Sequence, residues 1–196
     1  MTTMTATAAS YPLTFDVEYP AELSRWKIFV KWLLAIPHFL IVYLLNLAGN
    51  VVTVIAFFAI LFTKTYPRSL FDFAVGVQRW GANVTAYVGL MRDEYPPFSW
   101  EPGSYPVTYD VQYPEELSRW MIFVKWLLAV PHLIILFFVF IVALIVWFIA
   151  WFAILFTGKF PRPLFDFIVG TLRWNYRLNA YTGLLTDQYP PFSMKP

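Results

Sequence analysis

Residues 122–156 read IFVKWLLAVPHLIILFFVFIVALIVWFIAWFAILF, and residues 28–62 form a matching apolar stretch. About 20 apolar residues are enough to cross the hydrocarbon core of a bilayer, so each stretch is long enough for one tilted span. A buried core helix of a soluble protein would be shorter and would show a polar face. Both stretches therefore predict membrane-spanning helices. Their only Lys, Arg, His, Asp or Glu side chains lie near the N-terminal ends: Lys31, His38, Lys125 and His132.

The two apolar stretches belong to a tandem duplication with an offset of 94 residues and no insertion. Residues 11–100 form the first copy and residues 105–196 the second, with residues 101–104 as a short linker. Residues 1–10 lack the basic start and apolar run of a signal peptide, and we interpret them as a disordered tail. A duplication that keeps its register predicts that both copies share one backbone.

The composition of the 196-residue chain also favours a membrane protein. Hydrophobic residues make up 59% of the sequence and charged residues 13%, and the mean hydropathy is +0.58. The nine tryptophans fit a chain that lies repeatedly at the level of the lipid headgroups. No cysteine is present, which excludes disulfides, thiolate metal sites and a cysteine nucleophile. The formal charge of +2 is too small to indicate nucleic acid as a partner.

Three further segments recur in each copy. Residues 13–19 and 107–113 alternate apolar and polar side chains, which predicts short strands, and each copy offers the other a pairing partner. Residues 22–35 mix basic and aromatic side chains after a proline, so we expect an amphipathic helix in the membrane interface, repeated in the second copy. A second helix is expected over residues 70–90 and again over residues 164–185.

The positions of the basic residues bear on the topology. Lys and Arg stand at largely the same places in both copies, and inverted copies would need the opposite bias. We therefore predict an all-α membrane protein with two parallel copies of two spans each, four spans in total, whose short β-strands cap one face. The alternative folds each apolar stretch into a hairpin, with a turn near residues 48–50, and lays the second helix on the surface. That turn has no polar counterpart in the second copy.

A polar stripe is expected along the second helix of each copy, because its members recur at the spacing of one helix face. Ionisable side chains at membrane depth are costly and are usually paired and turned inward. The stripe therefore indicates either a lined path or binding site between the copies, or ion pairs that fix how the helices dock. Its members are Asp72, Arg79 and Asn83 in the first copy and Asp166, Arg173 and Arg177 in the second.

The two histidines, His38 and His132, hold equivalent positions directly after a proline. Two imidazoles on neighbouring spans can hold a haem iron from both sides, which is one hypothesis for this pair. The other hypothesis is a hydrogen bond from each imidazole to a carbonyl that the proline leaves free. No carboxylate lies at ligand spacing from either histidine, so a metal ion without a macrocycle is not expected.

The basic and aromatic residues at the start of each long apolar stretch are typical of contact with the membrane interface. Two interpretations stay open: recognition of anionic lipid headgroups, or ordinary anchoring at the interface. The basic side chains concerned are Arg25, Lys31, Arg119 and Lys125. The sequence contains no serine elbow, phosphate loop or carboxylate pair at catalytic spacing, so an enzyme is not expected.

Four motifs in this order resemble an uncharacterised family of bacterial integral membrane proteins that is classed as a domain of unknown function. They are KWLLAIPH at 31–38, FAILFT at 58–63, YPRSLFDF at 66–73 and DEYPPF at 93–98. The second copy repeats them with mild changes, so the resemblance covers nearly the whole chain. It implies a protein of the bacterial inner membrane and brings no activity, cofactor or catalytic residue.

These observations lead to a non-enzymatic multi-pass membrane protein as the expected function class. We expect an accessory or scaffold subunit that associates with other membrane proteins, with itself or with lipids, because nearly the whole chain is membrane surface. The alternative is a small transporter, or a binder of lipid or another small molecule, that uses the polar stripe. A third hypothesis is a haem-binding electron-transfer subunit that uses the two histidines.

Overall fold

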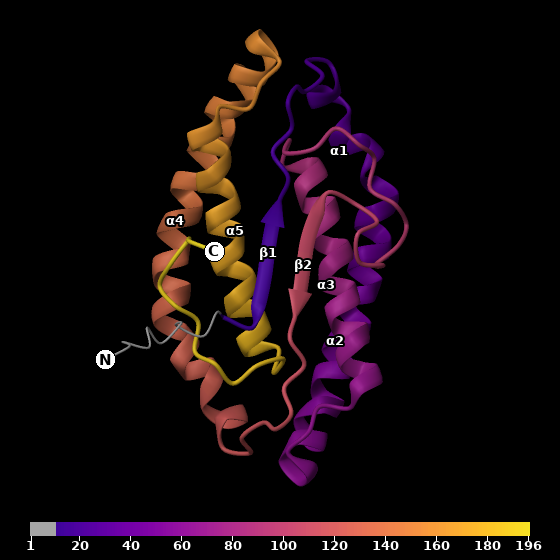
Figure 1. Cartoon of the computed structure of the whole chain (residues 1–196), viewed down its shortest axis with the longest axis vertical. Coiled ribbons are helices and arrows are strands. Elements are labelled where there is room, and N and C mark those ends of the chain that lie inside the picture. Colours follow the sequence, from indigo (N-terminus) through magenta and orange to yellow (C-terminus); the bar gives the residue numbers. More distant parts are fainter. Residues whose placement is uncertain (1–10) are drawn as a thin grey trace, which may run out of the picture.

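The computed structural model describes residues 11–196, and the tail expected over residues 1–10 lies outside them. In Figure 1 the elements lie side by side, with α2 and α4 at the two edges, α3 and α5 inside them, and the two strands in the middle. The elements are β1 (Leu13–Val17), the 3-10 helix η1 (Lys27–Phe29), α1 (Lys31–Leu34), α2 (Ile36–Thr63), α3 (Arg68–Val88), β2 (Val107–Val111), α4 (Met121–Thr157) and α5 (Arg162–Thr182).

The long apolar stretches form continuous helices. α2 has 28 residues and α4 has 37, and these are the two helices of residues 11–196 that are long and apolar enough to cross a membrane. The hairpin alternative is wrong, because α2 stays helical through residues 48–50. A turn there would leave backbone polar groups without partners in lipid, whereas a continuous helix pairs them internally.

The segment before α2 is not the amphipathic helix expected over residues 22–35. It holds only η1 and the four-residue helix α1, and most of the corresponding residues of the second copy belong to α4. Contacts between the copies account for the irregular start of each segment: the Leu23 N–H donates to Gly158 O at 2.8 Å, and the Leu117 N–H donates to Lys64 O at 2.8 Å. These bonds hold the start of each segment in an irregular conformation against the turn that follows the other copy's long helix.

The second helix of each copy begins directly after a proline and ends before a glycine. Pro67 and Pro161 stand at the N-terminal caps of α3 and α5, and Gly89 and Gly183 follow their last residues. Both helices carry charged residues and a polar side, and neither has the composition of a span. We predicted four membrane-spanning helices. Within residues 11–196, only α2 and α4 are candidates for such helices.

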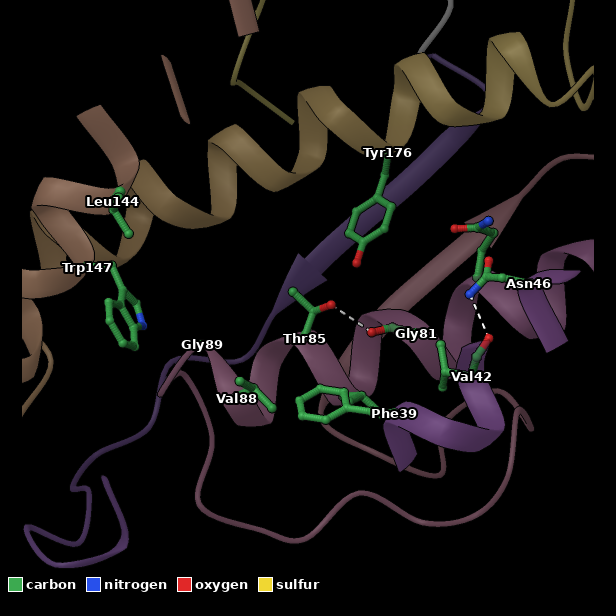
Figure 2. A pocket seen from close by; sticks show the side chains of 12 residues that line it. Phe39, Val42, Asn46, Gly81, Thr85, Val88, Gly89, Leu144, Trp147 and Tyr176 are labelled. Atoms are coloured by element: carbon green, nitrogen blue, oxygen red, sulfur yellow. Dashed lines mark hydrogen bonds between the residues drawn. The ribbon is translucent and has the colours of Figure 1, made fainter. Parts of the chain in front are cut away.

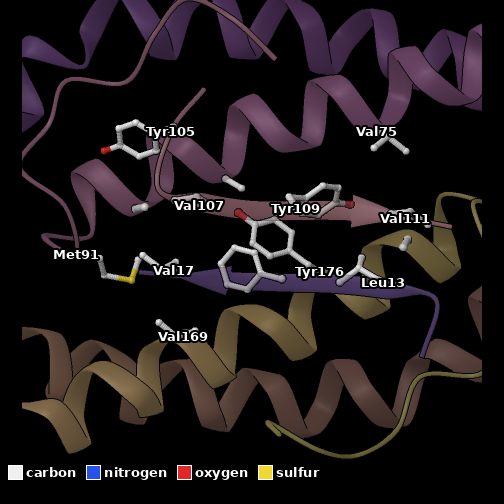
Figure 3. Packing of buried hydrophobic residues seen from close by; sticks show 14 of the residues in the cluster. Leu13, Val17, Val75, Met91, Tyr105, Val107, Tyr109, Val111, Val169 and Tyr176 are labelled. Carbon is white, nitrogen blue, oxygen red and sulfur yellow. The ribbon is translucent and has the colours of Figure 1, made fainter. Parts of the chain in front are cut away.

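The two strands pair with each other, which confirms the prediction from the alternating pattern. β1 and β2 are antiparallel, and Phe15 lies opposite Tyr109, its equivalent in the second copy. Odd-numbered strand residues are buried and even-numbered ones are exposed, so the sheet covers the helices with one face only. Figure 3 shows the resulting core, in which the ring of Tyr176 from α5 lies 4.7 Å from that of Phe15 and 5.3 Å from that of Tyr109.

The copies exchange their strands. β2 of the second copy packs against α3 of the first, and β1 of the first copy packs against α5 of the second. Two short strands are not stable alone, and here each gains its apolar contacts from the other copy. Neither copy therefore closes its core without its neighbour.

The two copies run in opposite directions, so the prediction of parallel copies is wrong. Figure 1 shows α2 descending from the upper end and α4 ascending from the lower end. Ring contacts agree: Phe57 near the end of α2 lies 5.4 Å from Phe123 at the start of α4, and Phe29 before α2 lies 5.3 Å from Trp151 near the end of α4. The cause is the antiparallel strand pair, which relates equivalent residues by a twofold axis perpendicular to the strands.

Candidate functional site

Arg79 lies in the middle of α3, next to the sheet, where it is 9% exposed. Its guanidinium donates from Nε to Tyr109 O at 2.8 Å, from Nη1 to Trp100 O at 2.9 Å and from Nη2 to Asp110 Oδ1 at 3.0 Å. The planar guanidinium suits this set because its donors point in fixed directions. The Arg79 side chain thus joins α3 to strand β2 of the other copy and to the C-terminal segment of its own copy, at Trp100.

Arg173 of α5 makes the equivalent contacts in the second copy. It donates to Phe15 O at 2.8 Å, to Met194 O at 2.8 Å and to Asp16 Oδ1 at 3.0 Å. A side chain at Gly170 would block this arrangement, since its Cβ would lie 2.8 Å from the Cβ of Met194. The two stripe arginines therefore fasten the exchanged strands and the C-terminal segment of each copy to the inner helices.

The carboxylates of the predicted stripe do not meet these arginines. Asp72 and Asp166 form exposed i,i+4 ion pairs with Arg68 and Arg162, at 3.0 Å and 2.9 Å. Exposed pairs of this kind contribute roughly 0.3–0.5 kcal/mol each. The carboxylates that pair with the stripe arginines come from the strands instead. Sequence reasoning missed them because each belongs to the other copy, far away in the chain.

The last position of the stripe is deeply buried in both copies. Asn83 is 1% exposed, and its Oδ1 has no hydrogen-bond partner within residues 11–196. Its counterpart Arg177 is 4% exposed, donates from Nη1 to Ser193 O at 3.4 Å and lies with its guanidinium 5.5 Å from the ring of Tyr11. The same place in the fold thus holds a neutral amide in one copy and a cation in the other.

Lys31 and Lys125 are buried, so these two members of the predicted headgroup set do not reach a lipid surface. Lys31 is 1% exposed, forms an ion pair with Asp93 at 2.8 Å and donates to the carbonyl of the residue before that aspartate at 2.7 Å. Lys125 is 2% exposed and makes the same two contacts with Asp187 and its preceding carbonyl, both at 2.8 Å. A buried ammonium group needs such partners, because its desolvation is costly.

Asp93 is a functional partner that the sequence did not single out, although its motif recurs in both copies. It accepts a hydrogen bond from the Ser24 N–H at 2.6 Å in addition to its ion pair with Lys31. Burial alone raises the pKa of this carboxyl, but the bonds from Lys31 and Ser24 outweigh burial and hold the pKa below its usual value. The carboxylate is therefore ionised at neutral pH.

Arg25 and Arg119 stay exposed beside the tryptophans that follow them, which are 63% and 81% exposed. Arg119 donates from Nη2 to Phe62 O at 2.9 Å, at the C-terminal end of α2, where a cation interacts well with the helix dipole. Arg25 belongs to the segment that binds Gly158 at the C-terminal end of α4. Since α2 and α4 end at opposite ends of the molecule, one basic and aromatic pair lies at each end (Figure 1).

His38 and His132 lie on α2 and α4, at opposite edges of the molecule, and each faces the inner helix of its own copy. The Nε1–H of Trp80 donates to His38 Nδ1 at 3.1 Å, and that of Trp174 donates to His132 Nδ1 at 2.9 Å. Each Nδ1 is therefore unprotonated, and a neutral imidazole then carries its hydrogen on Nε2, where a metal would have to bind. The structure does not bring the two histidines together, and a shared haem does not fit them.

The fold and these contacts define a class of protein: a helical protein of two strand-exchanged copies that run in opposite directions, each with one apolar helix of membrane-spanning length. These two helices, by their length and composition, suggest a membrane association. The chain belongs to the family described as Domain of unknown function (DUF4389), whose model matches residues 25–99 and again residues 119–194. The double match confirms the tandem copies and leaves the exchanged strands outside the matched regions. Comparison with curated proteins and with solved structures gives no match.

Proposed function

We propose that this protein is a non-enzymatic accessory or scaffold subunit of the bacterial inner membrane, in which α2 and α4 cross the bilayer and another membrane protein covers the sheet. The observation that carries the proposal is a charged sheet face that lies midway between the ends of two exposed, apolar helices. The two surfaces require different surroundings. Lipid around the apolar helices and a partner protein over the charged sheet would provide those surroundings.

α4 exposes apolar side chains on almost every side, and α2 does so apart from Asn46 and Asn50 near its middle. In the most apolar part of α2 and of α4, only 11% and 17% of the residues are buried by the rest of the protein. A helix that is apolar all round and not covered by protein is most stable in lipid. At a rise of 1.5 Å per residue, α2 is about 42 Å long, which reaches from one headgroup region to the other.

The two ends of the molecule suit the two membrane surfaces. Tryptophan and arginine are enriched where a helix meets the interface, and an exposed pair of these residues stands at each end. Because α2 and α4 run antiparallel, a chain with both helices across the bilayer has inverted copies. The similar placement of Lys and Arg in both copies then puts basic side chains at both interfaces, so it gives the inverted copies no bias that would set their orientation.

The sheet has the opposite character. The side chains of Asp16 and Asp110 are 66% and 69% exposed, and Thr14 and Thr108 lie on the same face. The strands lie midway along the long helices (Figure 1), so helices that cross the bilayer place these carboxylates near its centre. An unpaired charged side chain facing lipid at that depth costs about 2.5–3.5 kcal/mol on insertion scales, and the ion pairs with Arg173 and Arg79 at 3.0 Å offset part of that cost. The polar surface of a partner protein removes that cost.

The test is native mass spectrometry of the full chain, extracted gently from its own membrane, together with labelling of Thr108→Cys. The chain contains no cysteine, so one introduced thiol reports one position. We expect a different protein bound at fixed stoichiometry. We also expect a water-soluble maleimide to react with Thr108→Cys at least about tenfold more slowly in intact membranes than in the isolated chain. Glu116→Cys, at an exposed position near one end, is the control and should react equally in both.

Two results would overturn this proposal. Rapid labelling of Thr108→Cys in intact membranes, with only the bare chain in the spectrum, would mean that the sheet faces water and has no partner. Solute flux through liposomes that is lost in Arg79→Met, but retained in the surface variant Arg68→Met, would replace the scaffold role with transport through the polar stripe.

A further inference from the structure

A groove between the two copies is lined by helices and their ends. Its main cavity has a volume of 620 Å³, and Figure 2 shows side chains of α2 and α3 on one side and Leu144 and Trp147 of α4 on the other. Tyr176 of α5 points into the space between them (Figure 2). A second cavity of 420 Å³ continues the groove and shares Asn46 and Gln78 with the first. None of the residues that line the two cavities, all within residues 11–196, is charged.

Neutral hydrogen-bonding side chains gather where the two cavities meet. Asn46 and Asn50 project from α2, Gln78 from α3 and Asn179 from α5. Asn46 donates to the carbonyl of Val42 at 2.8 Å within its own helix, and its amide oxygen stays open. Within residues 11–196, the side chains of the other three amides form no hydrogen bond. Asn46, Asn50 and Asn179 are exposed and Gln78 is half-buried, so these amides are open to a hydrogen-bonding ligand that enters the groove.

The two copies contribute different chemistry to the groove. Trp147 and Leu144 form its apolar side, whereas the same helix positions of the first copy are polar. Four positions on this face carry a polar residue in the first copy and an apolar one in the second. The pairs of equivalent residues, first copy and second, are Asn46 and Phe140, Asn50 and Leu144, Thr53 and Trp147, and Gln78 and Leu172.

We propose that the groove binds an uncharged amphiphilic lipid. Its hydroxyl or carbonyl head pairs with the amides of Asn46 and Gln78, and its hydrocarbon body lies against Leu144 and Trp147. Amide groups both donate and accept, which suits a neutral oxygen head. A phosphate head would instead require cations, which the lining lacks. Diacylglycerols and isoprenoid quinones share the required chemistry.

The size and position of the groove agree with this ligand class. Cavities of about 300–1,000 Å³ with apolar walls and a few polar groups are typical of small-molecule sites. The groove lies between the copies and uses none of the stripe arginines, so its ligand does not depend on a partner over the sheet, although it rests on the proposed position of α2 and α4 in the bilayer. The site adds a binding function to the proposed accessory function.

The test uses the full chain in vesicles of phosphatidylethanolamine and phosphatidylglycerol that contain a photoactivatable diacylglycerol. A parallel set of vesicles carries a photoactivatable isoprenoid quinone. The probe that labels the chain more strongly shows which of the two head groups the groove prefers. We expect the label on the groove residues of α2, α3 and α4. The double variant Asn46→Leu, Gln78→Leu should take up about tenfold less, which corresponds to two lost hydrogen bonds of about 0.5–1.5 kcal/mol each. Tyr43→Phe, on the exposed face of α2 outside the groove, should label like the unmodified chain.

A third variant keeps the test independent of folding. Asn46→Gln retains an amide, so it should label at least half as strongly as the unmodified chain. Three results would overturn the proposal. Unchanged labelling of the double variant, or equal labelling by a photoactivatable phosphatidylcholine, would mean that bulk lipid fills the groove. Crosslinks between two chains in place of lipid label would mean that a second copy covers it.

Discussion

The helices α2 and α4 occupy equivalent places in the two copies, yet their exposed faces differ. α4 is the more apolar of the two helices. The difference comes largely from polar residues at the middle of α2 that line the groove, where α4 carries aromatic and aliphatic ones. The exposed face of α4 is therefore apolar along its length, whereas that of α2 is polar near its middle.

The contacts that hold the fold, by contrast, are nearly identical in both copies. The stripe arginines, the buried lysines and the histidines each meet equivalent partners at almost the same distances. The comparison separates two kinds of residue. The shared residues maintain the strand-exchanged framework, and several of those that differ line the groove.

The largest expected effect concerns the opposite directions of the two copies. Thr65→Cys and Lys159→Cys each place one thiol at an equivalent exposed position, just after α2 and just after α4. Because these helices run antiparallel, we expect an impermeant maleimide to label one variant only from outside and the other only from inside. Sealed membrane vesicles of both orientations provide the measurement. Labelling of both variants from the same side would mean that the long helices lie along the membrane surface.

An intermediate effect is expected from the stripe arginines, and it should be the same in both copies. Arg79→Met or Arg173→Met leaves one backbone carbonyl of the exchanged strand and one of the C-terminal segment without a donor. The free energy of unfolding should fall by on the order of 3 kcal/mol in each case. Thermal unfolding followed by circular dichroism in detergent is the measurement. The exposed Arg68→Met should cost less than about 0.5 kcal/mol. A clear difference between the two buried variants would contradict the shared framework.

The smallest expected effect is a pH dependence of stability in the first copy. The folded protein holds the pKa of Asp93 below its usual 3.8. Its ionised form therefore adds stability that is fully present above that value and is lost as the pH falls through the lower, folded-state pKa. The unmodified chain should lose stability more steeply than Asp93→Asn between about pH 4 and pH 2. Melting temperatures across that range test this, and equal slopes would contradict it.

Much of the secondary structure could be predicted from local pattern. The alternation at residues 13–19 located β1, and the apolar run of residues 28–62 located α2, because period and hydrophobicity act over a few neighbouring residues. The prediction of one interfacial helix over residues 22–35 was wrong. The segment starts irregularly, because Leu23 bonds to the turn at Gly158 of the other copy. The pattern of neighbouring residues cannot predict a backbone hydrogen bond to a residue so far away in the sequence.

In the candidate site, too, the features set by neighbouring residues could be predicted and those set by distant contacts could not. The sequence identified Arg79 and Arg173 as members of a polar helix face. Their partners could not be predicted, because Asp110 and Asp16 belong to strands that cross to the other copy. Lys31 illustrates the opposite error: its basic and aromatic neighbours indicated a surface role, whereas its carboxylate partner lies 62 residues further along the chain and buries it.

The sequence by itself determined where the chain is apolar enough to cross a membrane, where it forms strands and that it contains two equivalent copies. These properties depend on composition, period and repetition, which need no distant partner. Only the tertiary structure decided that the copies exchange strands, run in opposite directions and enclose a groove. The physical reason is the pairing of Phe15 with Tyr109 across a twofold axis perpendicular to the strands, a contact between residues 94 positions apart.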